Sequence, residues 1–239
     1  MKYMGSKRRI AKYILPIILE NRTPEQFYVE PFCGGCNMIE LVKGKRIAND
    51  YNEYVAEMWN ALVSRNWQPP TEITEEQYND IKANKEQYPK ELVGFTGIAV
   101  TFGSTWFGTY ARNKRGTNYA MEGRSNLIKQ VERLQGTIFT SSSYCDIALP
   151  KKSIIYCDPP YEGVAGYKDK FNPIAFWQWC REKTKEGHSV FVSEYNAPND
   201  FECIWQYELK TNMNAKYETK PVEKLSNLSH SGAGDFLHG

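Results

Sequence analysis

Residues 26–50 read QFYVEPFCGGCNMIELVKGKRIAND, and their pattern is typical of a parallel α/β sheet. Residues 26–32 predict a short buried strand that ends at the glycine pair 34–35. Residues 45–48 predict a second strand, which ends at Asp50. A strand that enters a glycine turn is commonly followed by a helix, so we expect strand, turn and helix in this order.

The alternation of strands and helices continues on both sides of this stretch. Ser6 is the expected N-cap of the first helix, and Thr74-Glu75-Glu76-Gln77 fits a capping box that opens another. The sequence therefore predicts an α/β fold whose mostly parallel sheet ends in a C-terminal antiparallel hairpin. We expect helices over residues 10–18, 55–62, 74–88, 124–134 and 171–185, strands over 137–140, 153–157 and 189–193, and a hairpin of 203–210 with 216–224.

Composition excludes several classes of protein. A chain of 239 residues with 41% hydrophobic and 24% charged residues has enough apolar material for a sizeable core, which excludes a disordered or fibrous protein. The longest apolar run is far shorter than the ~20 residues that cross a bilayer, so we expect no membrane partner. Six scattered cysteines favour a reducing, cytoplasmic setting. Cys33 and Cys36 lack a second pair of cysteine or histidine ligands at zinc spacing, so we expect no metal.

Charge is distributed unevenly along the chain. Residues 101–135 contain six basic and two acidic side chains, whereas residues 72–91 contain six acidic and three basic ones. Aromatic residues are interleaved with the basic ones, as in surfaces that hold phosphates with cations and stack bases on rings. A solvated loop with a few core aromatics explains the same pattern equally well.

The glycine turn after the first strand suggests a cofactor site. In open α/β sheets a ligand lies beyond the carboxyl ends of the strands, and an acid at the end of the next strand binds a ribose. Asp50 has that position, which favours a cofactor that contains a nucleoside. The glycine spacing matches neither the dinucleotide nor the Walker pattern, and an ordinary tight turn is the alternative.

Residues 154–161 read IIYCDPPY, a buried strand that stops at an acid, two prolines and a tyrosine. Because prolines lack N–H groups, acceptors dominate such a site: the carboxylate of Asp158 and free backbone carbonyls. A planar ligand with an amino group suits this arrangement, since the amino group donates two hydrogen bonds and the ring stacks on Tyr161.

Asp158-Pro159-Pro160-Tyr161, together with the upstream residues 30–34, resembles the amino-methyltransferases of DNA. The order of the segments resembles the Dam-like, phage-type adenine-N6 enzymes, with cofactor motifs first, then the basic insertion and then the catalytic tetrapeptide. The N-terminal residues 2–7 resemble the family's aromatic-x-Gly-Gly-Lys segment, with Ser6 in place of the second glycine. Ser143 stands where the family commonly has Asp. The resemblance implies contacts to S-adenosylmethionine from Tyr3, Lys7, Glu30, Pro31, Phe32, Gly34, Asp50, Tyr144 and Asp158.

The resemblance also implies an architecture and a reaction. It implies a Rossmann-like methyltransferase sheet in a catalytic domain of residues 1–65 and 124–239, interrupted by a mainly helical DNA-recognition segment of residues 66–123. A methyl group would pass from S-adenosylmethionine, leaving S-adenosylhomocysteine, to a flipped-out adenine in double-stranded DNA, without a metal. We expect a cytoplasmic monomer or weak dimer. The implied catalytic residues are Asp158, Pro159 and Tyr161, and the implied DNA contacts are Tyr110, Arg112, Asn113, Lys114, Arg115, Asn118, Tyr119 and Arg124.

Three alternatives are compatible with the same residues. A cytosine-N4 methyltransferase faces the same chemical problem at an exocyclic amine, although the segment order argues against it. A catalytically idle nucleic-acid-binding module would keep the fold but would not need an intact acidic tetrapeptide. An RNA methyltransferase is the third, because a basic aromatic segment does not reveal which sugar it contacts.

Overall fold

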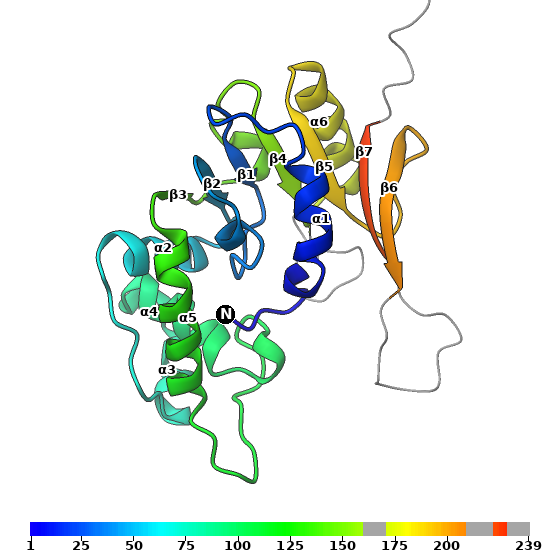
Figure 1. Ribbon diagram of the computed structural model, residues 1–239. Coiled ribbons are helices and arrows are strands. Elements are labelled where there is room, and N and C mark those ends of the chain that lie inside the picture. The colour runs from blue at the N-terminus through cyan, green and yellow to red at the C-terminus, as the bar shows by residue number, and fades with distance from the viewer. Residues whose placement is uncertain (160–170, 209–221, 229–239) are drawn as a thin grey trace, which may run out of the picture.

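The computed structural model describes residues 1–159, 171–208 and 222–228. These residues form a seven-stranded sheet in the order β3-β2-β1-β4-β5-β7-β6 (Figure 1). Strands β1 to β5 are parallel to one another, whereas β7 is antiparallel to both β5 and β6, which confirms the predicted sheet with its C-terminal hairpin. The strands are β1 (Tyr28–Glu30), β2 (Arg46–Asn49), β3 (Thr137–Thr140), β4 (Ile154–Cys157), β5 (Ser189–Ser193), β6 (Phe201–Glu208) and β7 (Val222–Leu228).

Helices cover both faces of this sheet. Alternate residues of a strand point to opposite faces, so Ile154 and Tyr156 join one apolar cluster while Ile155 and Cys157 join the other. The first cluster includes residues of α1, α2, α4 and α5, and the second is closed by α6. Burial on both faces is the pattern expected of parallel α/β sheets. The helices are α1 (Ala11–Ile18), α2 (Glu53–Ser64), α3 (Glu75–Ala83), α4 (Lys90–Ala99), α5 (Tyr119–Leu134) and α6 (Pro173–Lys185).

Some predicted helix boundaries were wrong. The glycine turn leads only into a 3₁₀ turn, Ile39–Leu41, because Cys36 has a φ of 53° that interrupts helical backbone. Ser6 caps the 3₁₀ turn Lys7–Arg9 instead of α1 itself. The helix opened by the capping box ends at Ala83, and a short 3₁₀ turn follows.

Later boundaries also differ from the prediction. Helix α5 begins at Tyr119 because the side chain of Asn118 accepts a hydrogen bond from the backbone N–H of Met121 and so caps it. Strand β7 begins at Val222, and the first part of the predicted strand 216–224 lies outside the described residues.

The segment 66–123 packs against the sheet domain. Ile73, Tyr78 and Phe95 from this segment join the same apolar cluster as Trp59 of α2 and Leu127 of α5. Helix α4 crosses α2 so closely that a Cβ at Gly94 would lie 2.1 Å from the backbone oxygen of Tyr54. The segment 66–123 therefore shares one apolar cluster with the sheet domain. Across the described parts of the chain, no helix is both long enough and apolar enough to span a bilayer.

Candidate active site

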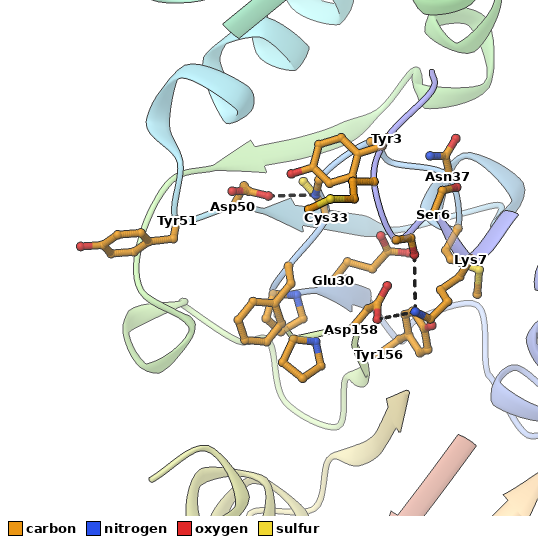
Figure 2. Close-up of a pocket in the computed structure, with 18 of the residues that line it drawn as sticks. Tyr3, Ser6, Lys7, Glu30, Cys33, Asn37, Asp50, Tyr51, Tyr156 and Asp158 are labelled. Atoms are coloured by element: carbon orange, nitrogen blue, oxygen red, sulfur yellow. Dashed lines mark hydrogen bonds and ion pairs between the residues drawn. The ribbon is translucent and has the colours of Figure 1, made fainter. Parts of the chain in front are cut away.

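The strand order places a crevice at the carboxyl ends of β1 and β4. The chain runs from β1 outward to β2 and β3 on one side, and from β4 outward to β5 on the other, so these two neighbours form the topological switch point. Ligands of doubly wound sheets bind at this point. A pocket of about 580 Å³ lies there, lined by the N-terminal segment and by residues that follow β1, β2 and β4 (Figure 2).

The glycine turn and Asp50 form one end of the pocket. The N–H of Gly34 donates to Asp50 Oδ2 at 2.9 Å, and the N–H of Asn52 donates to Oδ1 at 2.9 Å. Gly34 has a φ of 43°, and a Cβ there would lie 2.5 Å from the ring of Tyr3, so the turn requires glycine. Burial raises the pKa of Asp50 to about 6, against the two backbone donors that lower it. At neutral pH Asp50 is therefore mainly an anionic acceptor with lone pairs to spare.

Lys7 and Asp158 form the opposite end of the pocket, as Figure 2 shows. The Lys7 side chain is only 3% exposed, and its Nζ lies 3.0 Å from Asp158 Oδ1 and 3.5 Å from Glu223 Oε2 of β7. Burial disfavours the charged ammonium, but the two carboxylates outweigh burial and raise the pKa of Lys7 above its ordinary value. A buried cation thus holds Asp158 in place and favours its ionised form.

Glu30 lies deep between these two ends. Its side chain is buried and accepts a hydrogen bond from the hydroxyl of Tyr28 at 3.0 Å. Burial raises the pKa of Glu30 to about 8, and the negative charge of Asp158 adds to this effect. Glu30 is therefore largely a neutral carboxylic acid at pH 7, which can donate a hydrogen bond as well as accept one.

An aromatic wall lines another part of the pocket. The rings of Phe32 and Tyr144 lie 5.5 Å apart, and Phe171 lies 6.1 Å from Phe32 and 6.2 Å from Tyr144. Phe176 and Trp179 of α6 support Tyr144 from behind with edge contacts. These distances are those of packed aromatic pairs, and the ring planes differ by 38° to 77°, so the wall presents both ring faces and ring edges to a ligand.

Asn37 is a pocket residue that the sequence did not single out. Among the described residues its Oδ1 atom is buried without a hydrogen-bond partner. A buried acceptor without a partner costs free energy, so its position in a ligand pocket suggests that a ligand donor satisfies it. Ile98 and Trp106 line the pocket from the segment 66–123. Trp106 is one of the aromatic residues interleaved with the basic ones, but the sequence did not place it or Ile98 in the pocket.

All nine residues expected to contact the cofactor line this one pocket, although they come from distant parts of the chain. Pro159 lines it too, whereas Tyr161 lies outside the described residues. The pocket brings together Tyr3, Lys7, Glu30, Pro31, Phe32, Gly34, Asp50, Tyr144, Asp158 and Pro159, together with Ser143.

None of the eight residues expected to contact DNA lines the pocket, and several hold their own loop together. The hydroxyl of Tyr110 donates to the backbone oxygen of Ile73 at 2.7 Å. The guanidinium of Arg124 donates to the backbone oxygen of Pro69 and, at 2.8 Å, to Gln68 Oε1. These contacts give Tyr110 and Arg124 structural roles that their charge and aromaticity did not predict.

The other six residues expected to contact DNA include some with partners inside the protein and some that are exposed. Asn118 caps α5, Asn113 donates to the hydroxyl of Tyr119 at 3.0 Å, and Arg112 forms an ion pair with a glutamate of α3. Lys114 and Arg115 are exposed at the tip of the loop. Their contact with DNA stays a prediction.

The described ranges contain no group of three or more His, Cys, Asp or Glu side chains arranged to hold a metal ion. His188 lies far from the pocket along the strands, where its Nδ1 accepts a hydrogen bond from the backbone N–H of Ser153 at 3.1 Å before β4 begins. It therefore has a packing role at the amino-terminal ends of β4 and β5, away from the pocket.

Comparison with known proteins gives a family match over the N-terminal part of the chain. Residues 3–96 match the model of the D12 class N6 adenine-specific DNA methyltransferases. The candidate methyltransferase SMU.472, solved as a complex with SAH, superposes with a TM-score of 0.37 at 12% sequence identity, over 94% of this chain and 52% of that one. This chain spans about half the length of that protein.

Proposed function

Because residues 3–96 match the model of the D12 class of N6 adenine-specific DNA methyltransferases, we propose that this chain transfers a methyl group from S-adenosylmethionine to the N6 amino group of adenine in double-stranded DNA. The observation that carries the proposal is the layout of one pocket. Asp50, an acceptor suited to a ribose, lies at one end, and Asp158, an acceptor suited to an amino group, lies at the other.

The pocket residues fit S-adenosylmethionine. Asp50 uses two of its lone pairs for backbone donors and would accept hydrogen bonds from ribose hydroxyls with the others. Phe32 and Tyr144, which pack against each other, would contact the cofactor's adenine from one side. The unpartnered Oδ1 of Asn37 would accept from the cofactor's amino group. When bound, S-adenosylmethionine supplies a sulfonium methyl group that is open to attack by a nitrogen lone pair.

Asp158 and Pro159 prepare the target amine. The carboxylate of Asp158 and the backbone oxygen of Pro159 would each accept one N–H of the amino group, which favours a tetrahedral nitrogen with a free lone pair. Lys7 supports this role, because the ion pair at 3.0 Å favours the carboxylate form of Asp158 and fixes its position. The proton that the amine loses on methylation passes to water or to Asp158.

An adenine within a duplex cannot reach Asp158, so the base must leave the helix, and Tyr161 is the side chain proposed to stack on it. The segment 66–123 is proposed to bind the surrounding duplex, with Lys114 and Arg115 as its exposed cations. A protein that modifies DNA in this way would act in the cytoplasm, as a monomer or weak dimer.

The test is nucleoside analysis of methylated DNA. Purified protein is incubated with double-stranded DNA and S-adenosylmethionine, and the digested nucleosides are identified by mass spectrometry. N6-methyladenine from the wild type and none from Asp158→Ala supports the proposal. N4-methylcytosine as the product would refute the target base, and the absence of any methylated nucleoside would refute the activity.

A further inference from the structure

Three aromatic side chains form a surface outside the pocket, which we call the aromatic platform: Tyr13 of α1 with Trp205 and Tyr207 of β6. Their ring centroids lie 5.9–6.3 Å from one another, and their planes differ by only 9–21°. Three nearly parallel rings at almost equal distances cannot all be stacked face to face. They therefore lie side by side and offset, with their planes nearly parallel.

The platform remains open to solvent. Tyr13 is 44% exposed and Tyr207 is 41% exposed, although both rings contact Trp205. Burial of apolar surface alone would favour hiding these rings under a side chain. Exposed aromatic residues grouped in this way are typical of a binding surface.

Positive charge adjoins the platform. Lys12 Nζ lies 4.7 Å from the ring centroid of Tyr13, and Arg9 precedes Tyr13 by about one helical turn. Within the described residues neither Arg9 nor Lys12 has an acidic partner within ion-pair distance. Glu208 of β6 points to the other face of the strand, because it alternates with Tyr207. The rings can stack on the bases of a nucleic acid, and the cations can bind its phosphates. A purely apolar partner would leave the cations unused, and an acidic partner without bases would leave the rings unused.

The platform lies next to the reaction centre. Tyr207 is the cross-strand partner of Glu223, and Glu223 contacts Lys7, which contacts Asp158. Directly paired residues of an antiparallel ladder have Cα atoms only about 5 Å apart. In Figure 1, α1 begins at the end of the sheet toward which β6 runs. A DNA strand that places a base at Asp158 would therefore pass close to the platform.

We propose that the aromatic platform, with Arg9 and Lys12, is a second nucleic-acid contact, on which an unstacked nucleotide near the target base rests. The inference builds on the proposed function. It differs from the proposed role of the segment 66–123, because it assigns this contact to α1 and β6. A base removed from the duplex interrupts the stack, and aromatic rings are sequence-tolerant partners for exposed bases.

The first experiment measures affinity without methyl transfer. Fluorescence anisotropy with labelled DNA in the presence of S-adenosylhomocysteine compares a paired duplex with one that carries a single-stranded extension. We expect Tyr13→Ala and Tyr207→Ala each to weaken binding of the extended DNA about ten-fold, as the loss of one stacked base does. Tyr13→Phe and Tyr207→Phe should bind as the wild type does. Lys12→Gln should reduce the salt slope by about one.

Matched controls lie away from the platform. Ile138→Ala removes a 50% exposed side chain from β3 at the other edge of the sheet, and Lys151→Gln removes an exposed cation before β4 begins. Neither should change affinity. A second measurement needs no variant: photo-crosslinking of the wild type to DNA that contains 5-iodouracil should attach the DNA to the peptide with Trp205 and Tyr207.

Two results would overturn the inference. One is wild-type affinity in both alanine variants without a crosslink to β6. The other is self-association of the wild type in sedimentation that the alanine variants abolish, which would make the platform an interface between copies. Assaying N6-methyladenine in parallel separates the two proposals. If the wild type forms no methyladenine but the alanine variants lose DNA affinity, the proposed activity is refuted and the proposed nucleic-acid contact is retained. If the wild type forms methyladenine but the alanine variants keep their DNA affinity, the contact is refuted and the activity is retained.

Discussion

Lys7 Nζ lies 3.0 Å from Asp158 Oδ1, which ties the N-terminal segment to the end of β4 inside the protein. Glu223 of β7 contacts the same ammonium at 3.5 Å, so one buried cation serves two carboxylates. Burial of charge is unfavourable unless the charges are paired, and removal of one partner leaves the other uncompensated. The two ends of this network should therefore respond differently to substitution.

Asp158→Ala should abolish methyl transfer while the protein remains folded. Lys7 keeps a carboxylate partner in Glu223, so its charge is still compensated. Binding of S-adenosylmethionine, followed by calorimetry, should persist, because Asp50 and the glycine turn are unchanged. Residual methyl transfer at the wild-type rate would exclude Asp158 as the acceptor for the target amine.

Lys7→Met should be much more damaging to stability than Asp158→Ala. Without Lys7, the carboxylates of Asp158 and Glu223 remain close together in a buried site, which typically costs about 3–5 kcal/mol. Urea denaturation of the two variants measures the difference. Equal free energies of unfolding would show that the network contributes little to the fold.

Glu30→Gln should change how stability depends on pH. Burial raises the pKa of Glu30 to about 8, whereas the unfolded chain has an ordinary carboxyl of lower pKa. Between these two values only the folded state holds the proton, so stability falls as pH rises, by up to about 1.4 kcal/mol per pH unit. Glutamine cannot lose a proton, so the variant should show a flatter curve in denaturation from pH 5.5 to 8.5. A constant difference between variant and wild type across this range would contradict the shift.

The sequence predicted the parts of the site whose signals are local. Asp50 and Asp158 each follow a buried strand directly, and parallel strands place their carboxyl ends at one edge of the sheet. The glycine turn was predictable too, because its backbone conformation requires glycine and the sequence therefore shows it directly. The helix expected after that turn was wrong, since Cys36 has a positive φ and only the 3₁₀ turn Ile39–Leu41 follows.

Other contributors to the site depend on contacts that no local pattern reveals. Glu223 reaches Lys7 because β7 inserts between β5 and β6, and this order of strands cannot be read from the residues of β7. Asn37 lies between Cys36 and Met38, and it is distinguished only by its side-chain oxygen, which has no hydrogen-bond partner among the described residues. Charge suggested Arg124 as a DNA contact, but the structure gives its guanidinium two partners within the protein.

Asp50→Ala should weaken binding of S-adenosylmethionine by about 1.5–3 kcal/mol, because ribose hydroxyls would lose a charged acceptor. The pKa of about 6 adds a pH dependence: below pH 6 the carboxyl is protonated, so wild-type affinity should fall there while the variant's affinity stays nearly constant. Calorimetry from pH 5 to 8 measures both effects, with Glu76→Gln on the exposed face of α3 as a control. Wild-type affinity in a folded Asp50→Ala protein would remove Asp50 from the cofactor site.

Three of the basic residues expected to contact DNA should separate into two groups. Arg124→Ala should lower stability by about 1–2 kcal/mol, because the backbone oxygen of Pro69 and the side chain of Gln68 lose their donor. Lys114→Ala and Arg115→Ala should leave stability unchanged, since both side chains are exposed. Each should instead weaken DNA binding, either uniformly with a salt slope smaller by about one, as for a phosphate contact, or by about 1–3 kcal/mol at one base position, as for a base contact. Thermal denaturation and anisotropy at several salt concentrations separate the two groups. If Lys114→Ala and Arg115→Ala both kept the wild-type affinity and salt slope, the loop tip would have no part in DNA binding, and α1 with β6 would become the first place to look for it.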